Sequence, residues 1–258
     1  MFYVVKRQSL VFGVVFLLLF VILSVSVSTS GASAVFFGGT TRKVPVYGVE
    51  VPGDEKVIAL TFDAAWGADK TLEIIKILKE YDAEGTFFLV GFWIDKYPEE
   101  TKAIAEAGLE IGNHSNNHLN MSKLSETEIR KEIETVNERL VNLTGKRPVY
   151  FRPPYGDYNN RLIDTVVDLG MVPVQWSIDT LDWKGLSGKE IAERVLPKAK
   201  SGDIVLFHNN SDHVLDALPI ILLGLKNKGF KCVGLSKLVM TENYYIDNNG
   251  IQHIKNTA

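Results

Sequence analysis

Short apolar segments alternate with amphipathic segments along this chain, and the alternation restricts it to a few α/β architectures. The apolar segments are expected to be strands buried on both faces, because they contain few polar residues. They cover residues 57–62, 86–90, 109–111, 149–151, 172–178, 204–207 and 231–233. Strands separated by helices predict a parallel sheet with right-handed crossovers. Seven of them in ~200 residues favour a distorted, incomplete (β/α)7 barrel over an open sheet.

The segments between these strands carry signals for the start of a helix. Ser125 and Glu128 form a capping box, and Ser187 and Glu190 form a second one. Asp69 is expected to cap the helix that follows the first strand. Further helices are predicted over 99–107, 160–169 and 215–228. Each expected strand but the last is therefore followed by a helix, as the barrel requires.

Residues 1–34 have the organisation of an export signal. Lys6 and Arg7 precede an apolar run over 10–27, and Ala32-Ser33-Ala34 offers a cleavage site of small residues. This order is typical of a secretory signal peptide. The apolar run is also close to the ~20 residues that span a bilayer, so an uncleaved membrane-anchor helix stays open. Both alternatives predict export.

The rest of the chain is expected to form one exported domain. We assign 35–55 to a linker, 56–240 to the folded domain and 241–258 to a loose polar C-terminal tail. The net charge is −3 and no basic stripe is present, so nothing indicates nucleic-acid binding. Cys232 is the only cysteine, which excludes an intramolecular disulfide, and its apolar surroundings favour a buried structural thiol. The domain must then be stable through its core alone.

Polar residues stand at or just past the ends of five expected strands. They are Asp63, His114, Arg152, Asp179 and His208. In parallel α/β barrels the carboxyl ends of the strands meet at one mouth, where catalytic residues lie, so we expect these side chains to converge. Taken singly, each has a plainer explanation. His208 could be a core histidine, Arg152 could belong to a strand-ending turn, and Asp179 and Asp182 could cap turns, with Asp182 the better candidate for a structural role or the pocket lip.

His114 and His118 are separated by three residues and could bind one cation. Neutral imidazole is among the commonest metal ligands. The residues around them, including Asn116 and Asn117, are poor helix formers, so the pair is expected on a loop rather than on a helix as in zinc proteases. The spacing alone is equally consistent with two surface histidines.

Five segments, in this order, resemble the polysaccharide deacetylases with the NodB-homology domain, carbohydrate esterase family four. They are Thr61-Phe62-Asp63, His114-Ser-Asn-Asn-His118, Arg152-Pro-Pro-Tyr-Gly156, Asp179-Thr-Leu-Asp-Trp183 and Leu206-Phe-His208. The resemblance covers about 56–238, and residues 62–67 are most similar to the PdaB-like sporulation branch of Gram-positive bacteria. It implies a barrel of the NodB type and a hydrolase that removes N-acetyl groups from chitin or peptidoglycan sugars with a divalent metal, often zinc.

The resemblance also implies catalytic roles. Asp63 would be the general base and would pair with Arg152, whose charge favours the ionised carboxylate. His208 would be the general acid, oriented and kept protonated by Asp179. The backbone N–H of Tyr155 would supply one donor to the oxyanion. The apolar slot for the acetyl methyl or the sugar face would be lined by Trp183, Leu206 and Trp66.

His114 and His118 would hold the metal, but the sequence departs from the family at the next ligand. The family usually carries a second Asp directly after the base, whereas this chain has Ala64. Catalytic zinc normally has three protein ligands, so the ion would be weakly held. Three alternatives stay open. Asp63 could itself bind the ion, waters could complete the shell, or the site could be metal-free and inactive.

Two functions are therefore considered. The first is a metal-dependent N-deacetylase that acts on cell-wall or spore-wall polysaccharide outside the membrane, which the retained acid, base and Arg152 favour. The second is a non-catalytic glycan-binding or structural wall protein, which Ala64 suggests. The expected partners are a polysaccharide of peptidoglycan or chitin type and, if the N-terminal segment is uncleaved, the membrane.

Overall fold

The computed structural model describes residues 42–255 of the 258-residue chain. The expected signal or anchor segment therefore lies outside the described residues. Within 42–255, no helix combines the length and the apolar character that crossing a membrane requires.

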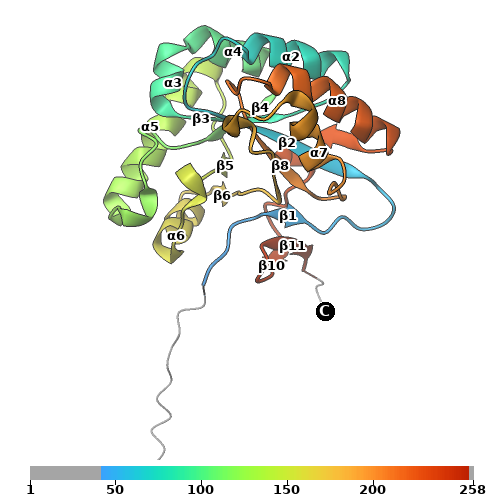
Figure 1. Cartoon of the computed structure of the whole chain (residues 1–258). Coiled ribbons are helices and arrows are strands. Elements are labelled where there is room, and N and C mark those ends of the chain that lie inside the picture. The colour runs from blue at the N-terminus through green and yellow to red at the C-terminus, as the bar shows by residue number, and fades with distance from the viewer. Residues whose placement is uncertain (1–41, 256–258) are drawn as a thin grey trace, which may run out of the picture. The chain divides into compact units, whose positions relative to one another are not determined.

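A curled parallel sheet forms the centre of the domain (Figure 1). Its strands are, in hydrogen-bonded order, β6 (Val172–Pro173), β5 (Tyr150–Phe151), β4 (Glu110–Asn113), β3 (Thr86–Leu89), β2 (Val57–Ala64), β8 (Ile204–His208) and β7 (Ile178–Asp179). The strand β9 (Lys231–Val233) also pairs with β2, and all these pairs are parallel. The predicted incomplete (β/α)7 barrel is confirmed.

The strand expected over 172–178 is divided into β6 and β7, which lie at opposite ends of the strand order. One end of this segment pairs with β5 and the other with β8, so a single stretch of chain runs from one edge of the sheet to the other. Between the two strands, the Gln175 N–H donates to the carbonyl of Val46 (2.7 Å). The segment closes the barrel with two short strands in place of one full strand, which explains the distortion.

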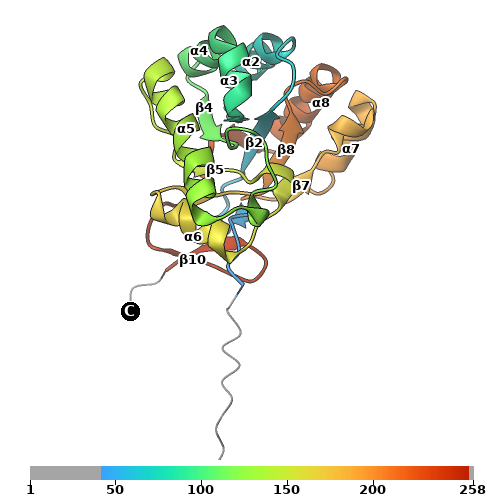
Figure 2. The same ribbon diagram turned by 90° about the vertical axis from the view of Figure 1, so that its left-hand side faces the viewer.

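Helices cover the outside of the sheet (Figures 1 and 2). They are α2 (Thr71–Glu80), α3 (Gly91–Lys96), α4 (Pro98–Glu106), α5 (Glu126–Thr144), α6 (Asn160–Asp168), α7 (Gly188–Val195) and α8 (Val214–Asn227). Both predicted capping boxes are present, at the starts of α5 and α7. Asp69 does not cap α2, because the helix begins later, and Lys70 at the N-cap makes no side-chain hydrogen bond to it.

Helix α3 was not expected from the sequence. It has only six residues, two of them aromatic and one a glycine, so its intrinsic helix signal is weak. Its first N–H groups are bound by another part of the chain: Gly91 donates to the carbonyl of Ser115 (3.0 Å) and Phe92 to that of Asn116 (3.3 Å). Tertiary hydrogen bonds to the histidine loop thus supply the N-terminal partners that its sequence lacks.

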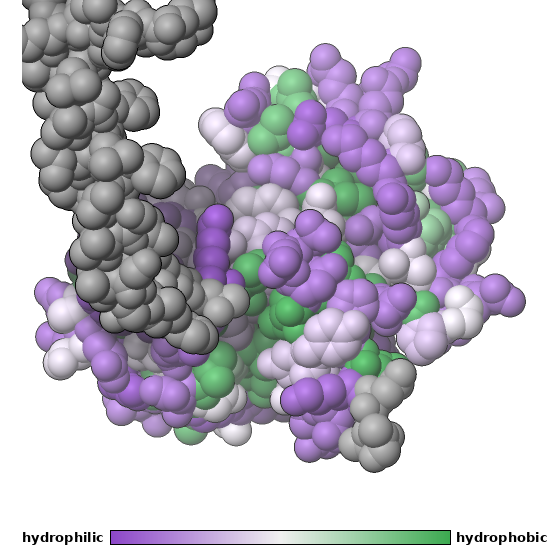
Figure 3. Space-filling view, turned by 90° about the horizontal axis from the view of Figure 1, so that it is seen from below, coloured by the Kyte–Doolittle hydropathy of each residue, from purple (hydrophilic) through white to green (hydrophobic). Residues whose placement is uncertain are grey.

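The C-terminal residues form strands, so the expected loose tail is wrong. β10 (Tyr244–Ile246) pairs antiparallel with β11 (Ile251–Ile254), which in turn pairs parallel with β1 (Gly48–Val49) from the expected linker. Gln252 in the middle of β11 is fully buried. Figure 3 shows the domain from below, the side on which β10 and β11 lie in Figure 1, where hydrophobic residues gather within a mostly hydrophilic surface. The pairing is long-range, which local sequence patterns do not reveal.

The core lies on both faces of β2. Ile58, Leu60 and Phe62 belong to a large apolar cluster that includes residues of the surrounding helices. Ala59 packs in a second cluster with Phe88 of β3 and residues of the closing segment. Because both faces of the strand are buried, its residues before Asp63 are apolar except Thr61, whose hydroxyl donates to the carbonyl of Val205 (2.7 Å). Cys232 on β9 is half-buried, and burial raises its pKa to about 12, which agrees with a structural thiol.

Candidate active site

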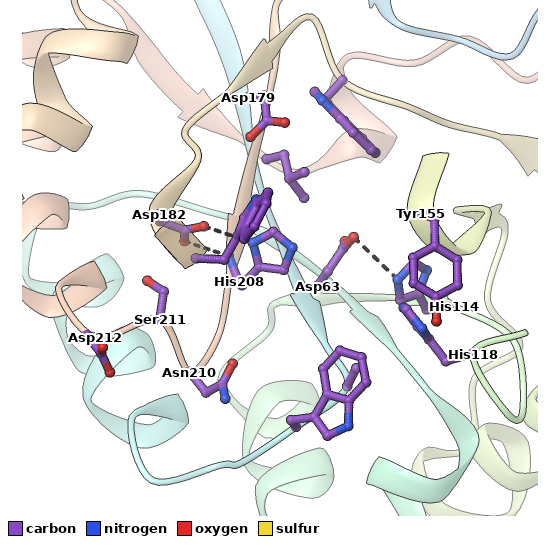
Figure 4. Close-up of a pocket in the computed structure, with 15 residues that line it drawn as sticks. Asp63, His114, His118, Tyr155, Asp179, Asp182, His208, Asn210, Ser211 and Asp212 are labelled. Carbon is purple, nitrogen blue, oxygen red and sulfur yellow. Dashed lines mark hydrogen bonds and ion pairs between the residues drawn. The ribbon is translucent and has the colours of Figure 1, made fainter. Parts of the chain in front are cut away.

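The carboxyl ends of the strands enclose a cavity of about 600 Å³. Asp63 on β2 lies opposite His208 on β8 in the strand register. Figure 4 shows Asp63 between His208 on one side and His114 with His118 on the other. The cavity is lined by Asp63, Ala65, Trp66, His114, His118, Tyr155, Trp176, Asp179, Asp182, Trp183, Leu206, His208, Asn210, Ser211 and Asp212. The expected convergence is confirmed, since four of the five strand-end residues line the cavity and Arg152 binds Asp63 from behind.

Asp63 is held by Arg152 in a buried ion pair. Arg152 Nη1 donates to Asp63 Oδ1 (2.7 Å), and Nη2 donates to the carbonyl of Gln175 (3.0 Å). The guanidinium is fully buried and lies over the ring of Phe88, 4.1 Å from its centroid. Burial raises the pKa of Asp63, but the charges of Arg152 and of the neighbouring histidines outweigh it, so the net pKa is lowered. Asp63 is therefore ionised at neutral pH.

His208 is bound by Asp182 and not by Asp179, so the expected acid–carboxylate pair is corrected. Asp182 Oδ1 accepts from His208 Nδ1 (2.8 Å), and Oδ2 accepts from the His208 backbone N–H (2.8 Å). Asp179 Oδ1 instead accepts from the N–H of Leu181 (2.8 Å), whose left-handed φ of 53° turns the chain. This turn directs Asp182, which is 1% exposed, toward His208. Asp179 remains on the cavity wall.

The Asp182 carboxylate favours the protonated form of His208. Burial lowers the pKa of His208, but the hydrogen bond to Asp182 and its charge outweigh burial, so the net pKa is raised. Because Asp182 occupies Nδ1, the nitrogen left for a ligand is Nε2. The cavity thus combines an ionised carboxylate, which can accept a proton, with an imidazole whose protonated form is favoured and can donate one.

His114 and His118 lie on the predicted loop, which follows β4. Two residues there have left-handed backbones, Ser115 with φ 68° and His118 with φ 52°. Asn113 Oδ1 accepts from the Ser115 N–H (2.8 Å), and Ser115 Oγ accepts from the His118 N–H (3.0 Å). These hydrogen bonds stabilise a conformation that costs L-residues ~1–2 kcal/mol each. The two imidazole rings lie 5.0 Å apart.

Glu132 on α5 supports this loop, and the sequence analysis missed it. Its carboxylate accepts from both the backbone N–H (2.8 Å) and the side-chain Nδ2 (2.6 Å) of Asn117. The side chain is buried, with 7% exposure. A signal was available, because Glu132 follows Ile129 by three residues and so lies on the apolar face of an amphipathic helix.

Both loop histidines are in the form that binds metals. Burial lowers the pKa of both, to about 4 for His118, so they are neutral near pH 7. His114 Nδ1 lies 2.7 Å from the carbonyl of Arg152 and must donate to it, which leaves a lone pair on Nε2. That lone pair faces Asp63 Oδ2 at 3.4 Å. His114 Nε2 and Asp63 Oδ2 are thus two acceptors that face each other, and a cation bound between them or the hydrogens of one water molecule can satisfy both.

Residues 42–255 lack the third metal ligand that the family usually has. Ala64 is fully buried among apolar side chains and offers a methyl group. Within residues 42–255, no three or more His, Cys, Asp or Glu side chains are grouped so that they could hold a metal ion. Within the described residues, His118 Nδ1 is buried without a hydrogen-bond partner. A free ring nitrogen of this kind is suited to binding a metal ion, but His114 and His118 alone do not make the usual three protein ligands. The two imidazoles can therefore supply two of the ligands in the coordination shell of a divalent ion.

Aromatic side chains form the remaining walls. Tyr155 has a left-handed φ of 61° and an exposed ring 4.6 Å from that of His118. Trp66 and Trp183 are exposed by 58% and 59%, and Leu206 is buried. All four line the cavity, as expected for substrate-contacting residues, while the oxyanion role of the Tyr155 N–H stays a prediction. No sequence motif indicated Trp176 or residues 210–212, which also line the cavity.

A barrel with an ionised carboxylate, a carboxylate-bound imidazole and two neutral histidines at its mouth has the constellation of a hydrolase site. The chain belongs to the polysaccharide deacetylase family, whose model matches residues 50–174. It is 36% identical to a peptidoglycan-N-acetylglucosamine deacetylase of Bacillus cereus over 76% of this chain and 72% of that one. It is also 32% identical to the peptidoglycan-N-acetylmuramic acid deacetylase PdaA of Bacillus subtilis over 72% of each chain. Deacetylases of this family are generally metal-dependent.

Solved structures of a relative concern inactive members of the family. A pseudoenzyme of carbohydrate esterase family four from Bacillus anthracis superposes with a TM-score of 0.73 and 32% identity, over 76% of this chain and 69% of that one. A mutant of the same protein, described as having restored enzymatic activity, gives 0.72 and 34%, over 76% and 71%. The family therefore includes folds of this kind with and without activity.

Proposed function

We propose that this protein removes N-acetyl groups from peptidoglycan-type amino sugars outside the cytoplasmic membrane. The main support is that an ionised Asp63 and a His208 whose pKa Asp182 raises face one cavity. Amide hydrolysis needs one group to take a proton from water and another to give one to the departing amine. Relatives named for activity on N-acetylglucosamine and N-acetylmuramic acid support this substrate class.

Asp63 acts as the general base in this proposal. Arg152 occupies Oδ1, so Oδ2 takes a proton from water as the water oxygen attacks the acetyl carbonyl carbon. A C–O bond forms and the carbonyl oxygen becomes an oxyanion, to which the backbone N–H of Tyr155 donates. Arg152 keeps the carboxylate fixed throughout, because it is itself held by the carbonyl of Gln175.

His208 completes the reaction as the general acid. Asp182 holds Nδ1, so the proton on Nε2 passes to the amine nitrogen as the C–N bond breaks. The products are acetate and a free amino sugar. Trp183 and Leu206 line the same cavity and would contact the acetyl methyl.

His114 and His118 would hold a divalent ion, and zinc is our candidate. When bound, such an ion polarises the acetyl carbonyl and promotes ionisation of water. Because Ala64 replaces the usual third ligand, we expect less than one ion per purified molecule and a full equivalent in Ala64→Asp. Elemental analysis of the two proteins tests this. Equal full occupancy would show that this chain supplies a third ligand from elsewhere.

The activity is tested by acetate release from peptidoglycan glycans and chitooligosaccharides with zinc, cobalt or manganese present. We expect Asp63→Asn to abolish release. Asp54→Asn is the matched control, since Asp54 is exposed at the other end of β2 and should leave release unchanged. Equal rates in wild type and Asp63→Asn would remove Asp63 as the base.

The absence of a three-ligand group from residues 42–255 also supports a second candidate, a non-catalytic wall protein that binds glycans. It predicts saturable glycan binding without acetate release under all three metals. Turnover with any one of them would eliminate it. The retained acid–base pair favours the enzyme.

We further propose that the domain is exported and either anchored by its N-terminal segment or released into the cell wall or spore envelope. The signal-like residues 1–34 support export. Fractionation of cells and spores with an antibody to the domain tests this, and recovery only from the cytoplasm would refute it.

A further inference from the structure

Glu132 is a buried acidic side chain that takes no part in the proposed reaction. It lies on α5 with 7% exposure, and both of its carboxylate oxygens accept from neutral N–H groups of Asn117, at 2.8 and 2.6 Å. Arg130 and Arg139 of the same helix pair with other acidic side chains. Among residues 42–255, Glu132 therefore has no ion-pair partner. A buried carboxylate without a countercharge is costly, so some other interaction must offset its burial.

The contact with Asn117 places this carboxylate directly behind the histidine loop. Asn117 precedes His118, whose backbone has a left-handed φ of 52° and whose ring lines the cavity (Figure 4). One donor of Asn117 belongs to its backbone and the other to its side chain, so Glu132 fixes both parts of the residue. The direction in which the chain enters His118 is thereby fixed as well.

Helix α5 also binds two other residues of this segment. Asn113 Nδ2 donates to Asn137 Oδ1 (2.8 Å), and Arg139 Nη1 donates to Asn116 Oδ1 (2.7 Å). Of these three contacts with the helix, only that of Glu132 brings a negative charge to the loop. Holding the loop in place does not require that charge, since neutral and cationic side chains do the same at the neighbouring positions.

We propose that Glu132 is a positioning residue of the metal site, which orients His118 through Asn117. Its charge also offsets the carboxylate that Ala64 does not supply. This inference rests on the proposed binding of a divalent ion by His114 and His118. Imidazole binds metals in its neutral form, so a cation held by two of them gains from a carboxylate in buried surroundings. Loss of a group that orients a metal ligand typically lowers metal affinity ~10–100-fold.

Calorimetric titration of the full protein with zinc ions tests the inference. We expect Glu132→Gln, which keeps the size but removes the charge and one acceptor, to lower zinc affinity about tenfold. Glu138→Gln is the matched control, because it removes an exposed carboxylate from the same helix and should leave the affinity unchanged. Both substitutions are also measured in Ala64→Asp, whose third ligand strengthens binding, and the same loss is expected there.

A merely structural role for Glu132 would change folding but not zinc affinity. The free energy of unfolding measured without metal reports the structural role, whereas the additional stabilisation by excess zinc reports binding. A folded Glu132→Gln protein that binds zinc as tightly as Glu138→Gln does, in both backgrounds, would overturn the inference. If Glu132→Gln does not fold, Asn117→Ala decides the matter, because it removes the partner of Glu132 and should lower the affinity similarly.

Acetate release measured on the same samples separates this inference from the proposed function. Release by the wild type together with equal zinc affinity in all variants would overturn the role of Glu132 and leave the enzyme intact. A loss of affinity in Glu132→Gln but not in Glu138→Gln, without any release by the wild type, would keep that role and reject the enzyme. Failure of both the wild type and Ala64→Asp to bind zinc would overturn the inference whatever the release.

Discussion

Replacing Asp182 by Asn tests which carboxylate serves His208. The structure places Asp182, 1% exposed, against both the ring and the backbone N–H of His208. Asn keeps the size and one acceptor but removes the charge of Asp182, which contributes most to raising the pKa of His208, so that pKa should fall. A smaller fraction of His208 would then be protonated at pH 7.5 than in the wild type.

The expected loss of kcat/KM is roughly 100-fold at pH 7.5, or about 3 kcal/mol of transition-state stabilisation, which is within the range of a general acid. The direction of the His208 pKa shift also determines how kcat/KM depends on pH. A raised pKa means that the acid is available below it and is lost as pH rises through it. Asp182→Asn should therefore move the alkaline limb of kcat/KM to lower pH.

Asp179→Asn is the matched control, because Asp179 lies on the same wall but bonds only to the N–H of Leu181. The charge of Asp179 raises the pKa of His208 less than Asp182 does, so we expect Asp179→Asn to change kcat/KM less than about threefold and to move the alkaline limb less than Asp182→Asn does. The reasoning is refuted if Asp179→Asn moves that limb and Asp182→Asn does not.

Three further predictions concern the scaffold. Glu132→Ala should lower the free energy of unfolding by about 1–3 kcal/mol, measured with denaturant, because Asn117 loses both acceptors; an unchanged midpoint would contradict this. Gly202→Ala should lower Tm far more than Gly145→Ala, although both glycines have a positive φ. A Cβ at Gly202 would lie 1.7 Å from the carbonyl oxygen of Val49, whereas a Cβ at Gly145 would have no atom within 4 Å. The hydrogen bond to Glu50, with a smaller contribution from Asp247, raises the pKa of His253, so its stabilisation of β11 should be complete below about pH 6.5 and lost as pH rises through the raised value. An NMR titration of His253 that gives a pKa at or below the ordinary value would exclude this.

The barrel and the meeting of Asp63, His114 and His208 could be predicted from the sequence because each depends on a strand and its end. The burial of β2 on both faces produces the apolar run, and parallel strands bring their carboxyl ends to one mouth. The partner of His208 could not be predicted in the same way. Asp179 and Asp182 are three residues apart, and the left-handed turn at Leu181 decides which side chain reaches the imidazole.

Other features were missed because their partners are distant in the chain. The first N–H groups of helix α3 donate to the carbonyls of Ser115 and Asn116, and β11 pairs with β1, some 200 residues before it. No window of local sequence contains such pairings. Glu132 is different, since a charged residue on the apolar face of α5 was a visible anomaly.

The segment that closes the barrel also connects residues near the start of the domain to Asp63, the proposed base. The carbonyl of Val46 accepts from the Gln175 N–H, the carbonyl of Gln175 accepts from Arg152, and Arg152 donates to Asp63. Val46 is thus three hydrogen bonds away from the carboxylate that would activate water. A shortened protein that begins beyond Val46 would lose the hydrogen bond from the Gln175 N–H to Val46, and with it one of the contacts that hold Arg152 and Asp63 in place.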